Sequence, residues 1–266
     1  PGPNGIRNII RWLHDQGNLK FVLLIGTSLD PQKSRRLPTD LDMIPNAGWP
    51  GSDLALAMPI GLTADDFIAR VPVGRIHAQH PDQIFTYLQK VMAMESTAST
   101  SRWRKNILHL SGGSTASERT LFKTYTQTFA AQIQQTSLAP SITTLSKTND
   151  DPIEQIPIHK YLNEGLALIT MFGHSGLEST DLNIGYASDS SHISPHTPYF
   201  PAVIVNGCAT GSIFYSNSTI SSDWIFAPKS GAVLFLAHTF NGASSYLQRY
   251  TASIYDVLAD PDFQSK

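Results

Sequence analysis

The chain has 266 residues, of which 41% are apolar and 15% charged, and its 19 Lys and Arg against 21 Asp and Glu give a net charge of −2. A chain of this length can bury a substantial core. Its near-neutral charge excludes the strongly basic field that binds nucleic acid or an anionic bilayer. No apolar run approaches the ~20 residues of a membrane-spanning helix, so we expect no nucleic-acid partner and no membrane insertion.

The chain contains one cysteine, Cys208. A single thiol excludes an internal disulfide framework and any zinc or iron–sulfur site with several cysteine ligands. Cys208 is therefore either a packing residue or a reactive group. The opening residues, Pro-Gly-Pro-Asn-Gly, resemble neither a signal peptide nor a targeting motif. We expect the sequence to be part of a longer polypeptide.

The first hundred residues predict an N-terminal α/β lobe whose beginning is missing. Apolar residues at helical spacing over residues 6–13 predict a helix that ends at Gly17. Residues 21–25 form a continuous apolar run, which is typical of a buried strand. Residues 26–66 are rich in Pro, Gly, Asp and Ser and predict a long loop. A second helix is predicted to begin at Pro81.

The Ser/Thr-rich stretch 96–101 predicts a boundary between residues 1–100 and a second lobe, residues 101–266. Strands are predicted at residues 106–110, 142–145, 166–172, 202–205 and 232–237, and helices at 117–136, 156–162 and 243–258. Thr115 and Glu118 form a capping box at the start of the first of these helices. Alternating strands and helices predict a mostly parallel sheet covered on both faces.

Two of the predicted strands run into polar residues flanked by glycines. Residues 166–172 continue into Gly-His174-Ser175-Gly, and residues 202–205 continue into Asn-Gly207-Cys208. Ligands of open α/β sheets bind beyond the carboxyl ends of the strands, so we expect His174 and Cys208 to converge there. A thiol beside an imidazole is a nucleophile–base pair. The amides of Ser175 and Cys208, beside Gly207, are the expected donors to a developing oxyanion.

Each of these residues also has a purely structural explanation. A free cysteine after a core strand is commonly a packing residue, and a single histidine after a strand is as often structural as functional. The conjunction of the two, each after an apolar strand and beside a glycine, favours catalysis.

A series of short segments runs in order through nearly the whole chain, at residues 21–26, 44–53, 73–76, 87–95, 103–113, 173–174, 206–208 and 231–236. The series resembles the gingipain-type cysteine peptidases, peptidase family C25, in the clan that also holds caspases and legumains. The resemblance implies a caspase-like three-layer α/β sandwich with a mostly parallel sheet in two lobes. It implies a cysteine endopeptidase that acts on peptide or protein substrates through a thioester acyl-enzyme.

The same resemblance implies that His174 is the general base and acid and that Cys208 is the nucleophile. The sequence departs from the family pattern at Ser175, where the family has glycine. A serine there keeps the amide N–H and adds a side chain. The resemblance also implies a bacterial protein that is secreted or held at the cell surface.

The sequence says much less about the substrate pocket. In similar proteins the turn after the next strand, residues 238–242, forms part of the pocket for the residue before the cleaved bond. We expect His238 and Phe240 to line this pocket, with ordinary loop packing as the alternative. Gingipains cut after Arg or Lys, which requires a buried acid. Spacing assigns that role to none of four acids, Asp150, Asp151, Glu154 and Asp223.

The sequence predicts no cofactor and no metal. His192 and His196 have the spacing of helical metal ligands, but Pro195 argues against a helix. Three loop acids are conceivable ligands of a structural calcium ion, Asp40, Asp42 and Asp53. Acidic residues in a loop are more often simply solvated than bound to calcium.

Gly112-Gly113, before the capped helix, is either an anion site or, more often, a tight turn.

Three functions are compatible with this pattern. The leading hypothesis is a cysteine endopeptidase. A sortase-like transpeptidase uses the same chemistry, with an amine instead of water resolving the acyl-enzyme. The third is a catalytically silent binding or scaffold domain on the same fold.

Overall fold

The structure, a computed structural model, describes residues 2–34, 36, 41–59, 68–191, 193 and 195–264. The chain divides into two compact units, one of Pro1–Ile84 with Ser212–Asn217 and the other of Phe85–Gly211 with Ser218–Lys266. This division falls inside helix α3 (Pro81–Glu95), whereas the sequence predicts a boundary between residues 100 and 101. The predicted lobe limits stay a prediction.

The first unit contains a two-stranded parallel sheet, in which β1 (Val22–Ile25) pairs with β2 (Val73–Ile76). Among the described residues, the unit also contains α1 (Pro3–Asp15), α2 (Pro31–Ser34), the 3-10 helix η2 (Leu54–Leu56) and the start of α3. The core cluster of this unit is Ile10, Leu24, Leu56, Ala57 and Val71. Helix α1 ends just before Gly17, whose φ of +79° suits a glycine after a helix, as predicted.

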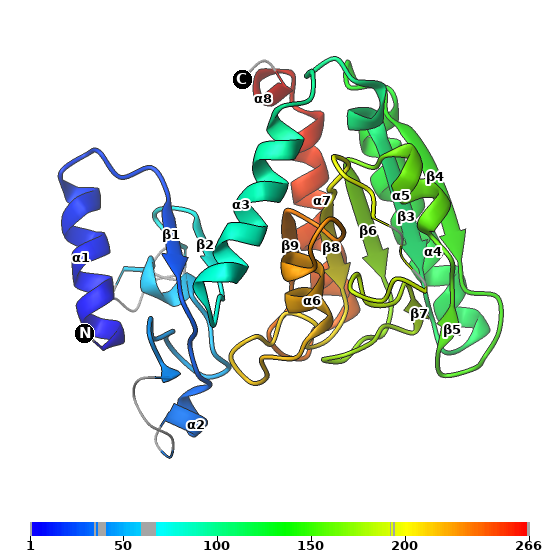
Figure 1. The fold of residues 1–266 in the computed structure, drawn as a ribbon. Coiled ribbons are helices and arrows are strands. Elements are labelled where there is room, and N and C mark those ends of the chain that lie inside the picture. Colours follow the sequence, from blue (N-terminus) through cyan, green and yellow to red (C-terminus); the bar gives the residue numbers. More distant parts are fainter. Residues whose placement is uncertain are drawn as a thin grey trace. The chain divides into compact units, whose positions relative to one another are not determined.

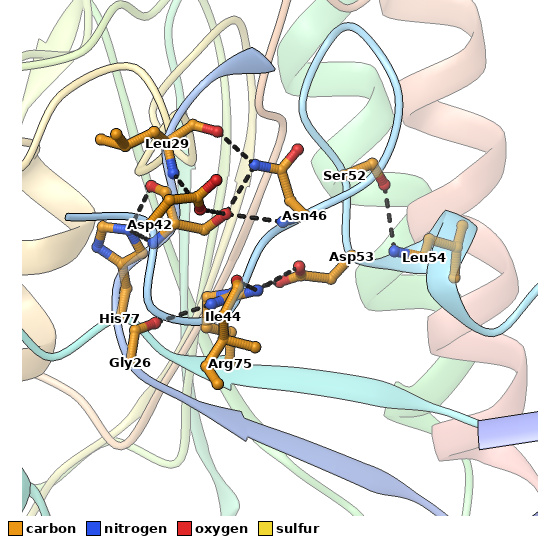
Figure 2. A network of polar contacts seen from close by, with 11 residues as sticks. Gly26, Leu29, Asp42, Ile44, Asn46, Ser52, Asp53, Leu54, Arg75 and His77 are labelled. Atoms are coloured by element: carbon orange, nitrogen blue, oxygen red, sulfur yellow. Dashed lines mark hydrogen bonds and ion pairs between the residues drawn. The ribbon is translucent and has the colours of Figure 1, made fainter. Parts of the chain in front are cut away.

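Strand β2 was not predicted, because its two central residues are an arginine, which interrupts the apolar pattern, and a glycine, which is uncommon in strands. Figure 2 shows how its arginine is accommodated. The side chain of Arg75 is 2% exposed and donates two 2.7 Å hydrogen bonds to the Asp53 carboxylate. It also donates to the carbonyl oxygens of Gly26 and Ile44, at 2.8 Å each. A buried cation is tolerable when its donors are paired in this way.

The second unit contains a sheet of five parallel strands in the order β4-β3-β6-β8-β9. These strands are β3 (Asn106–Ser111), β4 (Ser141–Ser146), β6 (Leu168–Phe172), β8 (Ala202–Asn206) and β9 (Leu234–Ala237). The two short strands β5 (Glu154–Gln155) and β7 (Leu182–Asn183) pair separately. The 3-10 helix η4 (Arg102–Lys105) leads into β3.

Helices cover both faces of the five-stranded sheet (Figure 1). On one face, α4 (Ala116–Gln134) and α7 (Ser244–Ala259) bury Phe129 and Tyr255 against the strands. On the other face, α5 (His159–Glu164) and α6 (Ile220–Phe226) bury Leu162 and Trp224. A last short helix, α8 (Pro261–Gln264), follows α7. The predicted three-layer α/β sandwich with a mostly parallel sheet is confirmed.

The strands of this sheet lie within two residues of their predicted bounds. The helix predicted over residues 156–162 begins only at His159, because Glu154 and Gln155 extend to pair with β7. Helix α6 was missed because its Ser-rich sequence has no clear apolar period; the Thr219 hydroxyl, which accepts from Ser222 N–H, starts it. Among the helices that the structure describes, none is both long and apolar enough to cross a membrane.

Candidate functional site

The two predicted reactive residues lie at equivalent positions on neighbouring strands. β6 and β8 are parallel partners, and Phe172 at the end of β6 is paired with Asn206 at the end of β8. His174 and Cys208 each follow two residues later. Beyond the last pair, Gly173 N–H donates to Asn206 O at 3.1 Å. The expectation that both side chains emerge at one edge of the sheet therefore agrees with the register.

The turns after the two strands are in direct contact. The Ser175 hydroxyl donates a 2.7 Å hydrogen bond to the carbonyl oxygen of Cys208. A Cβ at Gly207 would lie 2.1 Å from Ser175 Oγ and 2.8 Å from Gly173 O. Only glycine fits at position 207, because any side chain would push the histidine-bearing turn away from the cysteine-bearing one.

The imidazole of His174 is half-exposed and is held on one side by a carboxylate. Its Nε2 lies 3.1 Å from Glu118 Oε2, and its ring meets the edge of the Phe122 ring at a centroid distance of 5.8 Å. If Nε2 carries the proton donated to Glu118, Nδ1 is the basic nitrogen of the neutral ring.

Glu118 lies in the first turn of α4, where the capping box was predicted. The Thr115 hydroxyl accepts from Glu118 N–H at 3.2 Å, as predicted, but the carboxylate accepts from Ser114 N–H at 2.9 Å. Burial alone raises the pKa of Glu118, and the hydrogen bonds from His174 and Ser114 outweigh it, so the pKa is lowered. The contact with His174 was missed, since it depends on β3, which precedes α4, lying next to β6.

The thiol of Cys208 is unpaired and partly exposed, with Sγ 3.9 Å from the carbonyl oxygen of Gly242. The residue after it, Ala209, has a φ of +54°, and Thr210 N–H donates to Cys208 O at 2.8 Å. The cysteine thus lies on a tight turn rather than inside the apolar core. Within the described part of the chain, the backbone N–H groups of Ser175 and Cys208 donate to no other group.

The loop between β9 and α7 lies against this turn. Ala209 N–H donates to Phe240 O at 3.0 Å, and Gly211 N–H donates to His238 O at 2.9 Å. His238 is partly buried, which lowers its pKa, and Phe240 is 46% exposed. Both predicted pocket residues are therefore attached to the cysteine turn by their backbones. That their side chains line a substrate pocket stays a prediction.

Three of the four acids considered for an Arg or Lys pocket have other partners. Asp150 pairs with Arg119, Glu154 accepts from Thr148, and Asp223 accepts from Ser188 N–H. The backbone N–H of Asp151 donates to the Asn149 side chain, and its carbonyl oxygen accepts from the Lys147 side chain.

Two of the residues considered for metal binding, Asp40 and His192, lie outside the described residues. The other three have partners within the protein. His196 is buried with Nε2 3.0 Å from Gly231 O, and Asp42 accepts from Ser28 and Leu29. Asp53 pairs with Arg75. In the part of the chain that is described, no three His, Cys, Asp or Glu side chains are grouped to hold a metal ion.

Gly112-Gly113 forms the tight strand-to-helix turn rather than an open anion site. Gly113 has a φ of +126°, and its N–H donates to the carboxylate of Asp181 at 2.7 Å.

Comparisons with known proteins agree with this architecture. A family model described as peptidase family C25 matches residues 1–265. No curated protein sequence matches the chain.

Among solved structures, the chain is similar to the Arg-specific cysteine proteinase gingipain R (RgpB), with a TM-score of 0.75 and 17% identity over 97% of this chain and 58% of that one. It is similar to the complex of the Porphyromonas gingivalis RgpB pro- and mature domains, with a TM-score of 0.73 and 16% identity over 97% and 59%. A structure described only as a protease gives a TM-score of 0.67 and 15% identity over 93% and 52%. The chain thus spans less than two thirds of the length of these proteins.

Proposed function

The chain belongs to peptidase family C25, and we propose that it is a cysteine endopeptidase with Cys208 as nucleophile and His174 as general base and acid. The observation that carries this proposal is the register of β6 and β8, whose paired ends lead to His174 and Cys208 after the same number of residues. The contact between the two turns, through Ser175 and Gly207, supports a common site for both side chains.

In the proposed first step, His174 Nδ1 takes the proton of the Cys208 thiol, and the thiolate attacks the carbonyl carbon of the scissile peptide. The carbonyl oxygen becomes an oxyanion that accepts hydrogen bonds from the N–H groups of Ser175 and Cys208. When the C–N bond breaks, the imidazolium gives its proton to the leaving amine. A thioester between the substrate acyl group and Cys208 remains.

In the second step, His174 takes a proton from water, and the resulting hydroxide attacks the thioester carbonyl. The C–S bond breaks, the carboxylic acid leaves, and the thiolate recovers its proton from the imidazolium. An amine in place of water gives a transpeptidation product from the same thioester. Hydrolysis and transpeptidation are therefore separated by the products formed with and without an added amine.

Glu118 is proposed to orient the imidazole. Its carboxylate accepts from Nε2, which leaves Nδ1 free for proton transfer, and its charge favours the imidazolium that forms in each step. The lowered pKa of Glu118 favours its ionised form.

The proposed pocket wall, residues 238–242, contains no Asp or Glu. The solved relative is described as Arg-specific, and recognition of Arg requires a buried acid from outside this wall. We propose that the wall selects the residue before the cleaved bond through His238 and Phe240. The substrate is a peptide or protein, and the protein is proposed to act as a secreted or surface enzyme within a longer polypeptide.

The test is labelling with a peptidyl electrophile, read by intact mass, together with cleavage of a broad fluorogenic peptide library under reducing conditions. The wild type is expected to take up one label and to cleave part of the library. Cys208→Ala and His174→Ala are expected to lose about 10³-fold or more of the cleavage rate. His80→Ala changes an exposed histidine and is the matched control. A folded wild type that neither labels nor cleaves supports a binding or scaffold domain instead.

A further inference from the structure

A buried carboxylate that the proposed chemistry does not use lies directly behind the site. Asp181 is 4% exposed. Its carboxylate accepts hydrogen bonds from Gly113 N–H at 2.7 Å and from Leu182 N–H at 2.9 Å. A Cβ at Gly112 would lie 2.1 Å from Asp181 Oδ1, and one at Gly173 would lie 2.4 Å from it. The carboxylate thus occupies the space that two absent side chains leave at the ends of β3 and β6.

Asp181 also binds the backbone of the histidine turn. Its N–H donates to the carbonyl oxygen of His174 at 2.9 Å. One residue therefore holds both sides of the Glu118–His174 contact. Its carboxylate fixes the turn that leads into α4, and its amide fixes the peptide that carries the imidazole.

The contacts close into a ring. Asp181 Oδ2 accepts from Gly113, the next residue Ser114 donates to Glu118 Oε2 at 2.9 Å, and His174 Nε2 lies 3.1 Å from the same oxygen. The ring returns to Asp181 through the His174 carbonyl.

Within the ring the two side chains that meet are accessible to solvent, since those of His174 and Glu118 are 50% and 35% exposed. Ion pairs between exposed side chains contribute little order by themselves. A carboxylate that is buried and accepts backbone N–H groups is a stronger anchor, because its hydrogen bonds are charge-assisted and shielded from water.

We infer that Asp181 is a positioning residue, which holds Glu118 and His174 in the geometry that proton transfer requires. The inference rests on the proposed peptidase function. Asp181 acts through Glu118 and His174 and touches no substrate. Its effect is therefore expected on the rate of the chemical steps and not on substrate binding.

The test is a double-mutant cycle of Asp181→Asn and Glu118→Gln in the full chain, with kcat and KM measured for one peptide substrate. Asp181→Asn is expected to lower kcat about 10- to 100-fold and to change KM less than twofold. In the Glu118→Gln background the same change is expected to lower kcat less than threefold, because the contact it supports is already broken. Glu178→Gln, an exposed acid in the same turn, is the matched control.

Equal losses of kcat in both backgrounds, or an unchanged kcat in Asp181→Asn, overturn the inference. A second readout does not need activity: the long-range ¹H–¹⁵N spectrum of the imidazoles, which reports the tautomer of each ring. The wild type is expected to hold His174 with its proton on Nε2, and Asp181→Asn is expected to show a mixture of tautomers.

An inactive wild type with a single tautomer, lost in Asp181→Asn, refutes the peptidase function and leaves the positioning role in place. An unchanged tautomer in the variant refutes the positioning role. If Asp181→Asn does not fold, Asp181→Ser, which keeps a smaller acceptor, is measured in the same way.

Discussion

The hydroxyl of Ser175 is hydrogen-bonded to the carbonyl oxygen of Cys208 at 2.7 Å, so the residue after the imidazole holds the residue that bears the thiol. The same carbonyl accepts from Thr210 N–H at 2.8 Å. Two donors therefore fix the peptide that follows Cys208. The Ser175 side chain thus joins the two turns.

Ser175→Ala removes this hydrogen bond and keeps the Cβ. A hydrogen bond of this kind contributes about 1 kcal/mol, so kcat is expected to fall about three- to tenfold, with KM within twofold. The rate at which iodoacetamide alkylates Cys208 is expected to fall in parallel. Ser179→Ala, in the same turn, is the control. An unaltered kcat in Ser175→Ala means that the hydroxyl does not fix the position of Cys208.

Gly207→Ala introduces a Cβ that lies 2.1 Å from Ser175 Oγ and 2.8 Å from Gly173 O. The serine can rotate, but the backbone oxygen belongs to the histidine turn. We expect a loss of about 1–3 kcal/mol in the free energy of unfolding and a loss of at least tenfold in kcat/KM. Urea unfolding and steady-state kinetics measure the two effects.

Gly176→Ala is the matched control for that substitution, because no atom lies within 4 Å of the position of its Cβ. The control is expected to retain both stability and activity. Equal behaviour of the two variants contradicts the tight contact between the turns.

Glu118→Gln tests the pH dependence of the contact with His174. The pKa of Glu118 is lowered in the folded protein, so the folded state binds the proton of this group less readily than the unfolded state does. The stability that the carboxylate contributes is fully present above its ordinary pKa of about 4.3. That stability is lost as the pH falls through the lowered pKa that Glu118 has in the folded state.

The contribution of the Glu118 carboxylate to the difference in unfolding free energy between wild type and Glu118→Gln is therefore expected to be fully present at about pH 5. It should shrink as the pH falls below about 4. Urea unfolding at closely spaced pH values measures it. A difference that grows toward acid pH contradicts the sign of the shift.

Lys90 provides a separate test at neutral to alkaline pH. It is 2% exposed, and its Nζ donates to Trp224 O at 3.0 Å and to Ser230 O at 3.2 Å. Burial lowers its pKa to about 7, against the opposing effect of Asp223. Between pH 7 and about 10.4 the unfolded state holds this proton more tightly than the folded state, so stability rises with pH.

The unfolding free energy is expected to rise with pH by up to about 1.4 kcal/mol per pH unit from this one group. Lys90→Met has no titratable group at this position, so its unfolding free energy lacks this contribution. The measurement is the unfolding free energy at pH 7 and pH 9 for both proteins, and the wild type is expected to gain relative to the variant. Parallel pH profiles contradict the shifted pKa of Lys90.

The sequence predicts the sheet of the second unit well, because strands buried on both faces read as continuous apolar runs. Leu168–Phe172 and Ala202–Asn206 are such strands, and their glycine-flanked continuations mark the site. The sequence does not predict Val73–Ile76, whose arginine is stable in a strand only because Asp53 and two carbonyl oxygens are brought to it from distant segments.

The same limit applies to Glu118 and Asp181. In the sequence, one is half of a capping box and the other is a loop acid beside a strand. Their relation to His174 depends on which strands are neighbours in the sheet, and local patterns do not contain the strand order. The pair proposed to react can be predicted from the strand ends alone, but the residues proposed to support it require the three-dimensional register.

The residues proposed for catalysis and those proposed for substrate selection follow different strands of the sheet. The groups proposed to cleave the peptide bond follow two central strands, β6 and β8, each of which is hydrogen-bonded to a strand on both sides. The wall proposed to choose the substrate, residues 238–242, follows the edge strand β9 and is joined to the cysteine turn by the main-chain hydrogen bonds of His238 and Phe240. Side chains in that wall can be exchanged for others without disturbing those bonds, which makes it the natural segment to vary when a new cleavage preference is sought.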